Sequence, residues 1–394
     1  MNSNTTRGIL ISVSILAGIG ILMVYSSTAI MSMRNNGNGF NYLLKHLFTV
    51  GVGTAGMFIL SRVDYQKIRP VAIILLICSL LLLILVFVPG IGVSANGARR
   101  WLRVWPTTFQ PSELVKVVMV IFLADYMDTH IHRMREFRYG ILIPVGTMLV
   151  FQAIIISQPD FGAVMSLGIL TVGLLIIGGA RLRHIGVLLL LALPAIYMLI
   201  MTSQYRAKRF MCFLDPWKEP FGCGFQLVQS FIAFGNGSFF GLGLGGSKQK
   251  LYFLPEVHTD FIFSLIGEEL GLAGALCVLG FFIWLFIKGV QVSTRTKDPF
   301  SYFLTLGLTM LIGVQAVINF AVSTGLMPTK GLPLPFISYG GSSLLINMAA
   351  VGILINVARK NGSPVHKDTH SLIAGGNQRI LRSWRTDMRS ARQK

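Results

Sequence analysis

Residues 254–287 read LPEVHTDFIFSLIGEELGLAGALCVLGFFIWLFI, a short charged cluster followed by a long apolar run. A helix of about 20 apolar residues crosses the hydrocarbon core of a bilayer. The run therefore predicts a membrane-spanning helix, which we place at 259–288. On such a helix one carboxylate and three small residues share a face: Asp260, Ser264, Gly267 and Gly271. We expect this face to border a cavity.

Similar apolar runs recur along the whole chain. Of its 394 residues, 53% are hydrophobic and 12% are charged, whereas soluble proteins carry about 25% charged residues. We predict an all-α polytopic membrane protein with about ten transmembrane helices, which form one domain over residues 1–358. The predicted spans are 8–30, 42–61, 70–88, 112–128, 141–157, 162–179, 185–202, 259–288, 299–325 and 338–358. A long external loop, about 203–258, lies between the seventh and eighth helices.

The net charge of +19 would on its own also suggest a nucleic-acid partner. The basic residues, however, lie mostly in loops and in the C-terminal tail, where membrane orientation and anionic lipid headgroups account for them. With the N-terminus inside, 21 of the 34 Lys and Arg residues lie on the inner side. We therefore expect membrane lipids and no nucleic acid as partners, both termini in the cytoplasm, and a disordered basic tail at 359–394.

The loop 203–258 is too apolar and too aromatic to be disordered. Its segment 226–234 is too short to span, so it lies at the interface or re-enters the membrane. Loops of this length are usually functional when they are ordered. Cys212 and Cys223 share the loop, and either a disulfide or two free thiols fits the sequence. No Cys/His spacing typical of a metal site occurs in the chain.

Asp260 is the first candidate for chemistry. At the boundary between membrane and water it fits a general base that activates a hydroxyl group. It fits equally well a carboxylate at a helix N-terminus, where capping and the helix dipole favour negative charge. Glu256 and His258 favour the functional interpretation, because three ionisable groups in five residues exceed what capping needs.

Two further carboxylates stand at the ends of predicted spans. Glu113 and Lys116 are three residues apart and can pair on one helix face; a structural ion pair beside an N-cap at Ser112 is the alternative. Lys116 lies a turn inside the membrane, so it needs a partner or a wet cavity. Asp160 lies in a turn between two spans, where it satisfies backbone N–H groups, pairs with Lys116, or coordinates a cation together with Asp260.

External cations suit the binding of phosphate groups, although a solvated loop charge explains any one of them equally well. They are Arg99, Arg100, Arg103, Lys248, Lys250 and Lys330. The run GLGLGG at 241–246 superficially matches a dinucleotide fingerprint, but it lacks a βαβ context. Its glycines instead permit tight turns or the close approach of a ligand.

Five stretches resemble the signatures of one family. They are PEVHTDFIFSLIGEELG at 255–271, GARRWL at 97–102, QPSELVK at 110–116, QPDFG at 158–162 and PFISYGGSS at 335–343. Together they are similar to the SEDS family of shape, elongation, division and sporulation proteins, and the similarity covers nearly all spans. GLGLGGSKQK at 241–250 and MPTKGLPLP at 327–335 look like the division-type branch, while a sporulation-type relative stays open.

The resemblance implies a peptidoglycan glycosyltransferase of the bacterial plasma membrane, which polymerises lipid II on the outer side during cell division at the septum. It implies that Asp260 is the essential aspartate and that a divalent cation, Mg²⁺ or Mn²⁺, is required, with Asp260 and Asp160 as candidate ligands. Its implied partners are a class B penicillin-binding protein and other division proteins. Candidates for contact with lipid II or the nascent glycan strand are Arg100, Arg103, Glu113, Lys116, Asp160, Lys250, Glu256, His258, Lys330 and Ser338.

Lipid II combines a polyprenyl tail, a diphosphate and sugars, so its enzyme needs an apolar groove, cations at headgroup depth and a base just outside. We expect Asp260 to take a proton from the acceptor 4-hydroxyl, in an inverting transfer that releases polyprenyl diphosphate. A lipid II transporter also suits ten spans and intramembrane ions, and a division scaffold is a third alternative. The clustering of ionisable candidates on the outer side, rather than at the midplane, favours the enzyme.

Overall fold

The computed structural model describes residues 2–36, 39–95, 98–104, 107–250, 257–329 and 331–361. The chain divides into one unit, Met1–Asn361, and a second unit, Gly362–Lys394. The second unit, which holds most of the predicted disordered tail, lies outside the described residues. Two of the predicted site residues, Glu256 and Lys330, also lie outside them.

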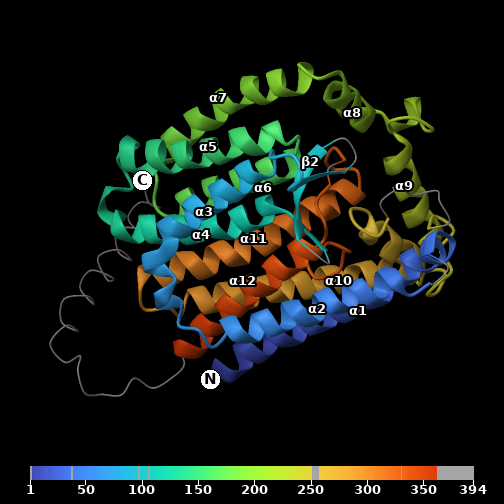
Figure 1. Ribbon diagram of the computed structural model, residues 1–394, viewed down its shortest axis with the longest axis horizontal. Helices are drawn as coiled ribbons and strands as arrows, with labels where there is room; N and C mark the ends of the chain where they lie inside the picture. The colour runs from blue at the N-terminus through green and yellow to red at the C-terminus, as the bar shows by residue number, and fades with distance from the viewer. Residues whose placement is uncertain are drawn as a thin grey trace. The chain divides into compact units, whose positions relative to one another are not determined.

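Long helices run side by side through the first unit, as Figure 1 shows. Among the described residues, each of the ten predicted spans coincides with one helix, which confirms an all-α polytopic membrane protein. The ten are α1 (Asn2–Asn36), α2 (Asn41–Leu60), α3 (Ala72–Leu85), α4 (Pro111–Thr129), α5 (Ile143–Ser157), α6 (Phe161–Ile177), α7 (Leu182–Met201), α10 (Ile262–Ser293), α11 (Pro299–Ser323) and α12 (Gly341–Lys360). Eight helical segments in the described part of the chain are long and apolar enough to cross a membrane; of the others, α6 has 17 residues and α4 carries four charged residues.

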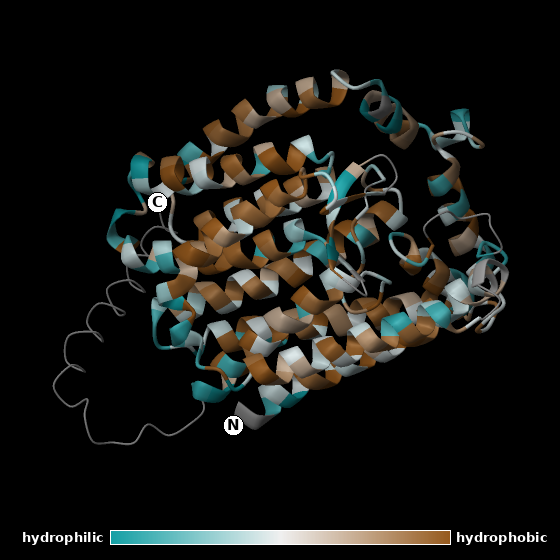
Figure 2. Ribbon diagram, viewed as in Figure 1, coloured by the Kyte–Doolittle hydropathy of each residue, from teal (hydrophilic) through white to brown (hydrophobic). Residues whose placement is uncertain are grey.

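The helices begin where the sequence supplies a start signal. Asp298 precedes α11 and accepts a hydrogen bond from the N–H of Ser301 at 2.9 Å. Proline occupies the first position of α4 and of α11, where its missing N–H costs no intrahelical bond. Figure 2 shows apolar residues along the middle of most long helices and polar residues at their ends and connections. A bilayer requires this pattern, because helices satisfy their own backbone inside the hydrocarbon.

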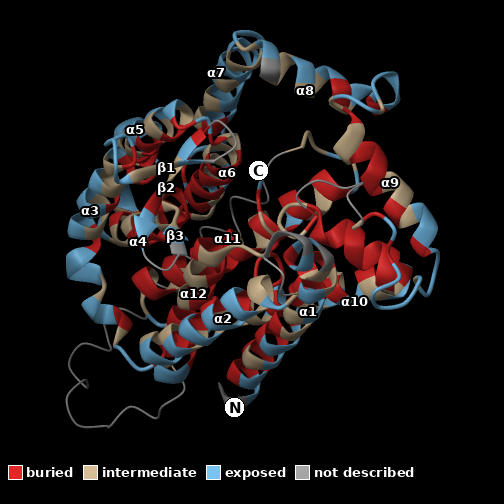
Figure 3. Cartoon of the chain, turned by 45° about the vertical axis from the view of Figure 1, so that its right-hand side comes forward, coloured by how far each residue is buried: buried red, intermediate tan, exposed pale blue. Residues whose placement is uncertain are grey.

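The centre of the unit is formed by α4, α11 and α12, most of whose residues are buried (Figure 3). The helix α7 is the opposite case, because nearly all of its apolar side chains are exposed. A helix that is apolar all round and still exposed is typical of a membrane span that faces lipid. Shorter helical pieces are found at Tyr65–Lys67, Arg69–Val71, Ile131–Arg133, Arg138–Leu142 and Pro216–Lys218.

Between α3 and α4 the chain forms a small antiparallel sheet. Its strands β1 (Gly92–Ala95), β2 (Ala98–Val104) and β3 (Thr107–Phe109) pair in the order β1-β2-β3. The register places Leu102 opposite both Gly92 and Phe109. The sequence predicts only an external loop here, because strands this short hold too few residues to show a clear alternation. The end of the helix bundle that carries this sheet is called the sheet end below.

The predicted external loop contains two helices, α8 (Gln204–Leu214) and α9 (Phe225–Gly237). Of the two states that the sequence left open for Cys212 and Cys223, the structure has the disulfide, with the Cα atoms 6.0 Å apart. The apolar segment 226–234 lies within α9, which packs against α10 and buries several of its residues: Leu227, Val228, Gln229, Ser230, Ala233 and Gly237.

The helix α10 is interrupted rather than continuous. At Gly271 the backbone leaves helical geometry, with φ 68° and ψ −169°. The ring of Phe320 on α11 lies 4.5 Å from the ring of Phe263 and 5.6 Å from the ring of Phe282. Residues with that separation in sequence would lie about 28 Å apart on a straight helix. The two parts of α10 therefore fold back on each other as a helical hairpin.

This hairpin corrects the single helix predicted at 259–288. We call residues 262–270 the first arm and residues 272–293 the second arm. A side chain at Gly271 would collide with the backbone of Phe239, and the positive φ also favours glycine. Two carboxylates, Glu268 and Glu269, interrupt the apolar run just before the break, but the run resumes after it, so the stretch is predicted as one span.

The cavity-lining face predicted for this helix is also wrong. That face consists of Asp260, Ser264, Gly267 and Gly271. Asp260 precedes the helix, and Gly271 is not helical. The other two residues pack against α9. Ser264 Oγ lies 2.6 Å from Ser230 Oγ, and the ring of Phe234 occupies the space beside Gly267. A neighbouring helix therefore fills the face.

Candidate active site

Asp260 lies in the turn that leads into the first arm, and its side chain is partly buried. The arm begins at Ile262, its N-cap residue is Phe261, and no side chain caps it. Asp260 therefore does not occupy the N-cap position itself, although it lies next to the start of the arm, where the helix dipole favours a negative charge. Its carboxylate faces the loop before α12, because Oδ2 lies 3.1 Å from the position that a Cβ on Gly331 would occupy.

Hydrogen bonds hold this turn against the loop that precedes α12. Ser338 Oγ donates to the carbonyl oxygen of Thr259 at 2.5 Å and accepts from the N–H of Leu334 at 2.8 Å. The N–H of Tyr339 donates to the carbonyl oxygen of His258 at 2.9 Å. Ser338 thus lies beside the predicted base, as a support for its backbone.

A single amide joins both segments to α11. The Nδ2 atom of Asn319 donates to the carbonyl oxygen of Asp260 at 2.9 Å and to that of Leu332 at 2.8 Å. Asn319 is only 1% exposed. Two loop segments that are distant in sequence therefore meet at one buried side chain.

The contacts of the first arm with α11 fix its direction. Next to the start of the arm, Asp260 is bonded to Asn319. Further along, the Ser230 hydroxyl lies 2.6 Å from the Ser264 hydroxyl and 2.6 Å from the Ser323 carbonyl oxygen. The first arm therefore runs in the same direction as α11. Asp260 lies at the beginning of this arm, beside Asn319. Asn319 is one helical turn, or about 6 Å along the axis, before the last residue of α11.

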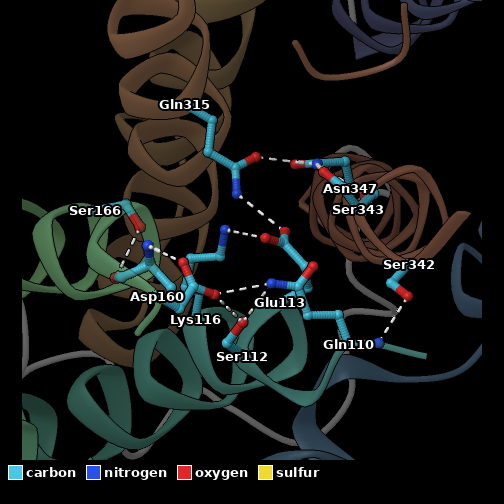
Figure 4. Close-up of polar contacts among 11 residues, drawn as sticks. Gln110, Ser112, Glu113, Lys116, Asp160, Ser166, Gln315, Ser342, Ser343 and Asn347 are labelled. Atoms are coloured by element: carbon cyan, nitrogen blue, oxygen red, sulfur yellow. Dashed lines mark hydrogen bonds and ion pairs between the residues drawn. The ribbon is translucent and has the colours of Figure 1, made fainter. Parts of the chain in front are cut away.

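A network of buried polar side chains links α4, α11 and α12 one turn further down α11 (Figure 4). Lys116 Nζ and Glu113 Oε1 are 2.7 Å apart, and their side chains are 1% and 3% exposed. Gln315 donates to Glu113 at 3.4 Å and accepts from Asn347 at 3.0 Å. The pairing that the sequence spacing predicts is present, and it supplies the partner that an intramembrane lysine needs.

Asp160 adjoins this network in Figure 4 and caps α6. Its Oδ2 atom accepts hydrogen bonds from Gln110 Nε2 at 2.9 Å and from Ser112 Oγ at 3.1 Å. Its Oδ1 atom accepts from the N–H of Ala163 at 3.2 Å. Of the roles left open by the sequence, the structure has the one in which Asp160 satisfies backbone N–H groups. Ser112 bonds to Asp160, and the N-cap position of α4 is Gln110 instead.

The sheet carries three of the predicted cations, Arg99, Arg100 and Arg103. Arg100 on β2 donates to the carbonyl oxygens of Gln158, at 3.1 Å, and of Pro159, so it ties the sheet to the turn before α6. Arg103 is on the same strand and is exposed. Arg99 is exposed as well, so Arg99 and Arg103, unlike Arg100, are accessible as a phosphate-binding cation would be.

Lys250 lies near the tip of the hairpin. Its Nζ atom is 2.8 Å from Glu269 Oε1 and 3.0 Å from Ser26 Oγ, and the side chains of Lys250 and Glu269 are 6% and 0% exposed. Glu269 and Asp260 are about 13 Å apart along the first arm. The structure therefore does not bring Lys250 to Asp260. Its charge balances a buried carboxylate instead.

His258 belongs to an aromatic cluster next to the turn. Its ring lies 6.1 Å from that of Tyr42 on α2 and 5.7 Å from that of Tyr339, and the ring of Tyr339 lies 6.0 Å from that of His46. The cluster joins α2 to the two loops that surround Asp260.

Sequence reasoning missed the polar face of α11 and two buried carboxylates, Glu268 and the partner of Lys250, Glu269. Gln315, Asn319 and Ser323 recur every four residues within an apolar run, so they lie on one helix face. That spacing is a usable signal, because polar side chains inside a membrane helix need partners. Glu268 is 0% exposed and accepts hydrogen bonds from the Ser247 hydroxyl and, at 3.3 Å, from the Lys248 N–H.

The described residues contain few groups of side chains that could bind a metal ion. Among the described residues, the one group of three metal-type ligands within reach of each other consists of Cys212, Glu219 and Cys223, and its two cysteines form the disulfide. Asp160 already accepts three hydrogen bonds from neutral donors, so it is less available to a metal ion than a carboxylate with free lone pairs. Asp260 alone suits Mg²⁺, which is usually bound by one or two carboxylates together with water and substrate phosphates.

Comparison with known proteins identifies the family of this chain. The model of the FtsW, RodA and SpoVE family, described as "Cell cycle protein", matches residues 7–363. The chain belongs to this family. A probable peptidoglycan glycosyltransferase FtsW from Geobacter metallireducens is 43% identical over 357 residues, which cover 90% of this chain and 95% of the relative. Stage V sporulation protein E from Bacillus subtilis is 38% identical over 349 residues, which cover 88% and 94%.

Solved structures of family members have the same fold. A chain of a peptidoglycan synthase complex that coordinates polymerization and crosslinking has a TM-score of 0.74 and 28% identity, with 91% of this chain and 98% of that chain covered. The rod shape determining protein RodA of Thermus thermophilus has a TM-score of 0.67 and 25% identity, with 91% and 97% covered. The resemblance to the division-type branch is confirmed by the relatives named FtsW.

Proposed function

We propose that this family member is a peptidoglycan glycosyltransferase that polymerises lipid II into glycan strands during cell division. One observation carries the proposal: the partly buried Asp260 lies in a turn that hydrogen bonds hold to two other segments, about one helical turn from a buried charged network. A carboxylate in a fixed position suits general-base catalysis. Relatives that are named as probable peptidoglycan glycosyltransferases support the reaction class.

In the proposed reaction, Asp260 accepts the proton of the 4-hydroxyl of the acceptor sugar. The hydroxyl oxygen forms a bond to the anomeric carbon of the donor, and the bond from that carbon to polyprenyl diphosphate breaks. Attack on the face opposite the leaving group converts an α-linked donor into a β-linked product, so one base suffices without a covalent intermediate. Positioned general-base catalysis contributes about 10²–10⁴ in rate.

The surroundings of the cations divide them into two roles. Arg100, Lys116 and Lys250 contact protein groups, and we assign them to shaping the site. The side chains of Arg99 and Arg103 are exposed on β2 at the sheet end, and they suit the diphosphate of lipid II, because guanidinium groups bind phosphate in a bidentate manner.

A divalent cation, Mg²⁺ or Mn²⁺, is part of the proposal and comes from the family resemblance. Asp260 is the first residue that would hold it, and Asp160 is the weaker candidate, because its oxygens already accept three hydrogen bonds. When bound, such an ion would neutralise charge on the departing diphosphate. Polymerisation that survives EDTA treatment, with no gain on re-addition of either ion, would remove the cation from the proposal.

The proposal also covers location and partners. The sheet end would face the outer side of the plasma membrane, both termini would be cytoplasmic, and the protein would act at the septum. Its partners would be a class B penicillin-binding protein and other division proteins. The match to a chain of a complex that coordinates polymerization and crosslinking supports a crosslinking partner.

The decisive experiment compares Asp260→Asn with wild type in purified full-length protein, together with its transpeptidase partner, given lipid II in detergent. We expect the variant to form glycan strands at least about 10²-fold more slowly, with an unchanged thermal midpoint. Asp64→Asn is the control. It makes the same substitution at an exposed carboxylate, which forms an ion pair with Lys360. Near wild-type polymerisation by folded Asp260→Asn protein would refute the catalytic assignment.

Transport of lipid II is the second candidate function, and the buried Glu113–Lys116 pair favours it, since transporters carry ions within the bundle. Detergent removes the membrane barrier, so glycan product formed there cannot arise from transport. Movement of lipid II across proteoliposomes without any glycan product would favour the transporter. Complementation of a division defect by localised Asp260→Asn protein would favour a scaffold.

A further inference from the structure

We infer that Asn319 is a positioning residue for Asp260, an inference that rests on the proposed role of Asp260 as the base. The amide nitrogen of Asn319 has two N–H bonds, and both have acceptors, the carbonyl oxygens of Asp260 at 2.9 Å and of Leu332 at 2.8 Å. One planar group therefore sets the distance between the turn that carries Asp260 and the loop that carries Gly331, which the Asp260 carboxylate faces.

The helix that carries the amide is itself fixed within the bundle. Asn319 is 1% exposed. Gln315 lies one turn earlier on the same face of α11 and is bonded to Glu113 and Asn347. These bonds join α11 to α4 and α12. The backbone at Asp260 is thereby placed relative to the buried network, as well as by its own loop.

Asn319 contacts the backbone of the turn and supplies no group to the reaction. Its effect on rate follows from geometry, because a displacement of about 1 Å at a catalytic group costs about 10²-fold in rate. A displaced base slows the chemical step and leaves the contacts that bind lipid II in place. The signature of a positioning residue is therefore a fall in kcat with little change in KM.

Asn356 on α12 provides a matched control. It is also buried, and it makes the same number of backbone contacts: Nδ2 donates to the Ser61 carbonyl oxygen at 3.0 Å, and Oδ1 accepts from the Tyr65 N–H at 3.2 Å. Asn356 lies close to the C-terminal end of α12, away from the sheet end. Asn356→Ala therefore loses two hydrogen bonds to backbone groups, as Asn319→Ala does, without disturbing the turn at Asp260.

The experiment measures kcat, KM for lipid II and the thermal midpoint of both variants in the full-length protein with its transpeptidase partner. For Asn319→Ala we expect kcat to fall about 10- to 100-fold while KM stays within about threefold. For Asn356→Ala we expect kcat within about twofold of wild type and a loss of thermal midpoint similar to that of Asn319→Ala.

Two further variants keep the inference testable if Asn319→Ala is recovered unfolded. Asn319→Ser retains one donor and should give an intermediate fall in kcat. Asn319→Asp has nearly the same shape but places a carboxylate against two carbonyl oxygens, so it should be slower than Asn319→Ser.

Equal kcat values for folded Asn319 variants and Asn356→Ala, or an effect confined to KM, would overturn the inference. Asp260→Asn is measured in the same series. If it is inactive while Asn319→Ala behaves like Asn356→Ala, the positioning role alone fails. If Asp260→Asn is active, the proposed base fails, and the role of Asn319 fails with it.

Discussion

The pair of Glu113 and Lys116 shows how single residues constrain this protein. Both side chains are almost fully buried, and a buried charge is tolerated only when it is paired and hydrogen-bonded. Gln315 supplies an additional bond to Glu113, and Asn347 in turn holds Gln315. The pair is therefore stable as a unit and sensitive to the loss of either partner.

We predict that Glu113→Gln destabilises the protein strongly, because it leaves the Lys116 ammonium buried beside a neutral amide. Breaking a buried pair costs about 3–5 kcal/mol, which thermal unfolding of the purified protein would detect. The double variant Glu113→Gln/Lys116→Met removes the uncompensated charge and should recover part of the loss. A double variant less stable than Glu113→Gln would contradict this electrostatic account.

The sequence predicts the Glu113–Lys116 pair because the two residues share a helix face at a spacing of three. It does not predict Gln315 as a partner, because that residue is 202 positions away from Glu113. The charged neighbours of Asp260 mark it as a candidate. The four-residue spacing of polar residues on α11 marks Asn319 as part of a polar helix face, but it does not reveal that Asn319 contacts the turn of Asp260.

At the scale of elements, the hairpin of α10 depends on one glycine. The apolar run contains other glycines, yet within it only Gly271 has a positive φ. Glycine occurs on both sides of the turn, and the short first arm merges with the long apolar second arm, so the sequence predicts one long span where the structure has two arms. The signal that would separate Gly271 from the others is tertiary: the backbone of residues 237–243 lies against it.

We predict that Gly271→Ala sharply lowers the yield of folded protein, because a Cβ there collides with the backbone of Phe239 and the positive φ is unfavourable for alanine. Gly280→Ala is the matched control in the second arm. Nothing lies within 4 Å of a Cβ at Gly280, so this change should be neutral or slightly stabilising. Size-exclusion chromatography and thermal unfolding would compare them. A folded, active Gly271→Ala protein would contradict the hairpin.

At the scale of the whole described unit, the two ends of the helix bundle differ in kind. The sheet end carries Asp260 and the loops around it. The opposite end carries exposed ion pairs, Arg69 with Asp125 and Lys360 with Asp64. The hydrogen bond from Lys360 lowers the pKa of Asp64 below its usual value, so this carboxylate stays ionised at neutral pH. Exposed pairs of this kind contribute little to stability.

We predict that a membrane-impermeant maleimide added to intact cells labels Arg103→Cys but not Lys297→Cys. Both positions are exposed, and they lie at the sheet end and in the connection between α10 and α11 respectively. Cys78 and Cys277 would be replaced in both variants, because they are exposed thiols. Labelling of Lys297→Cys in intact cells, with none of Arg103→Cys, would reverse the proposed orientation.

Hydropathy alone predicts the number and order of the long helices, because a bilayer imposes the same length and apolarity on every span. It predicts neither the sheet nor the position of α9. Both are set by packing between segments outside the spans, for which the sequence offers only Gly, Pro and aromatic residues without a clear period. The disulfide between Cys212 and Cys223 is predicted only in part. The sequence allows it, but only the fold shows that the two residues meet.

Phe320 has a consequence for the cooperativity of the region around Asp260. Its ring touches both arms of the hairpin, so the arm that begins next to Asp260 cannot part from α11 without loosening a span as well. Local opening near the carboxylate and global unfolding thus share contacts, and both arms belong to one cooperative unit in the sense of hydrogen exchange. If Asp260 is the base, as proposed, it lies beside a unit whose two arms open together.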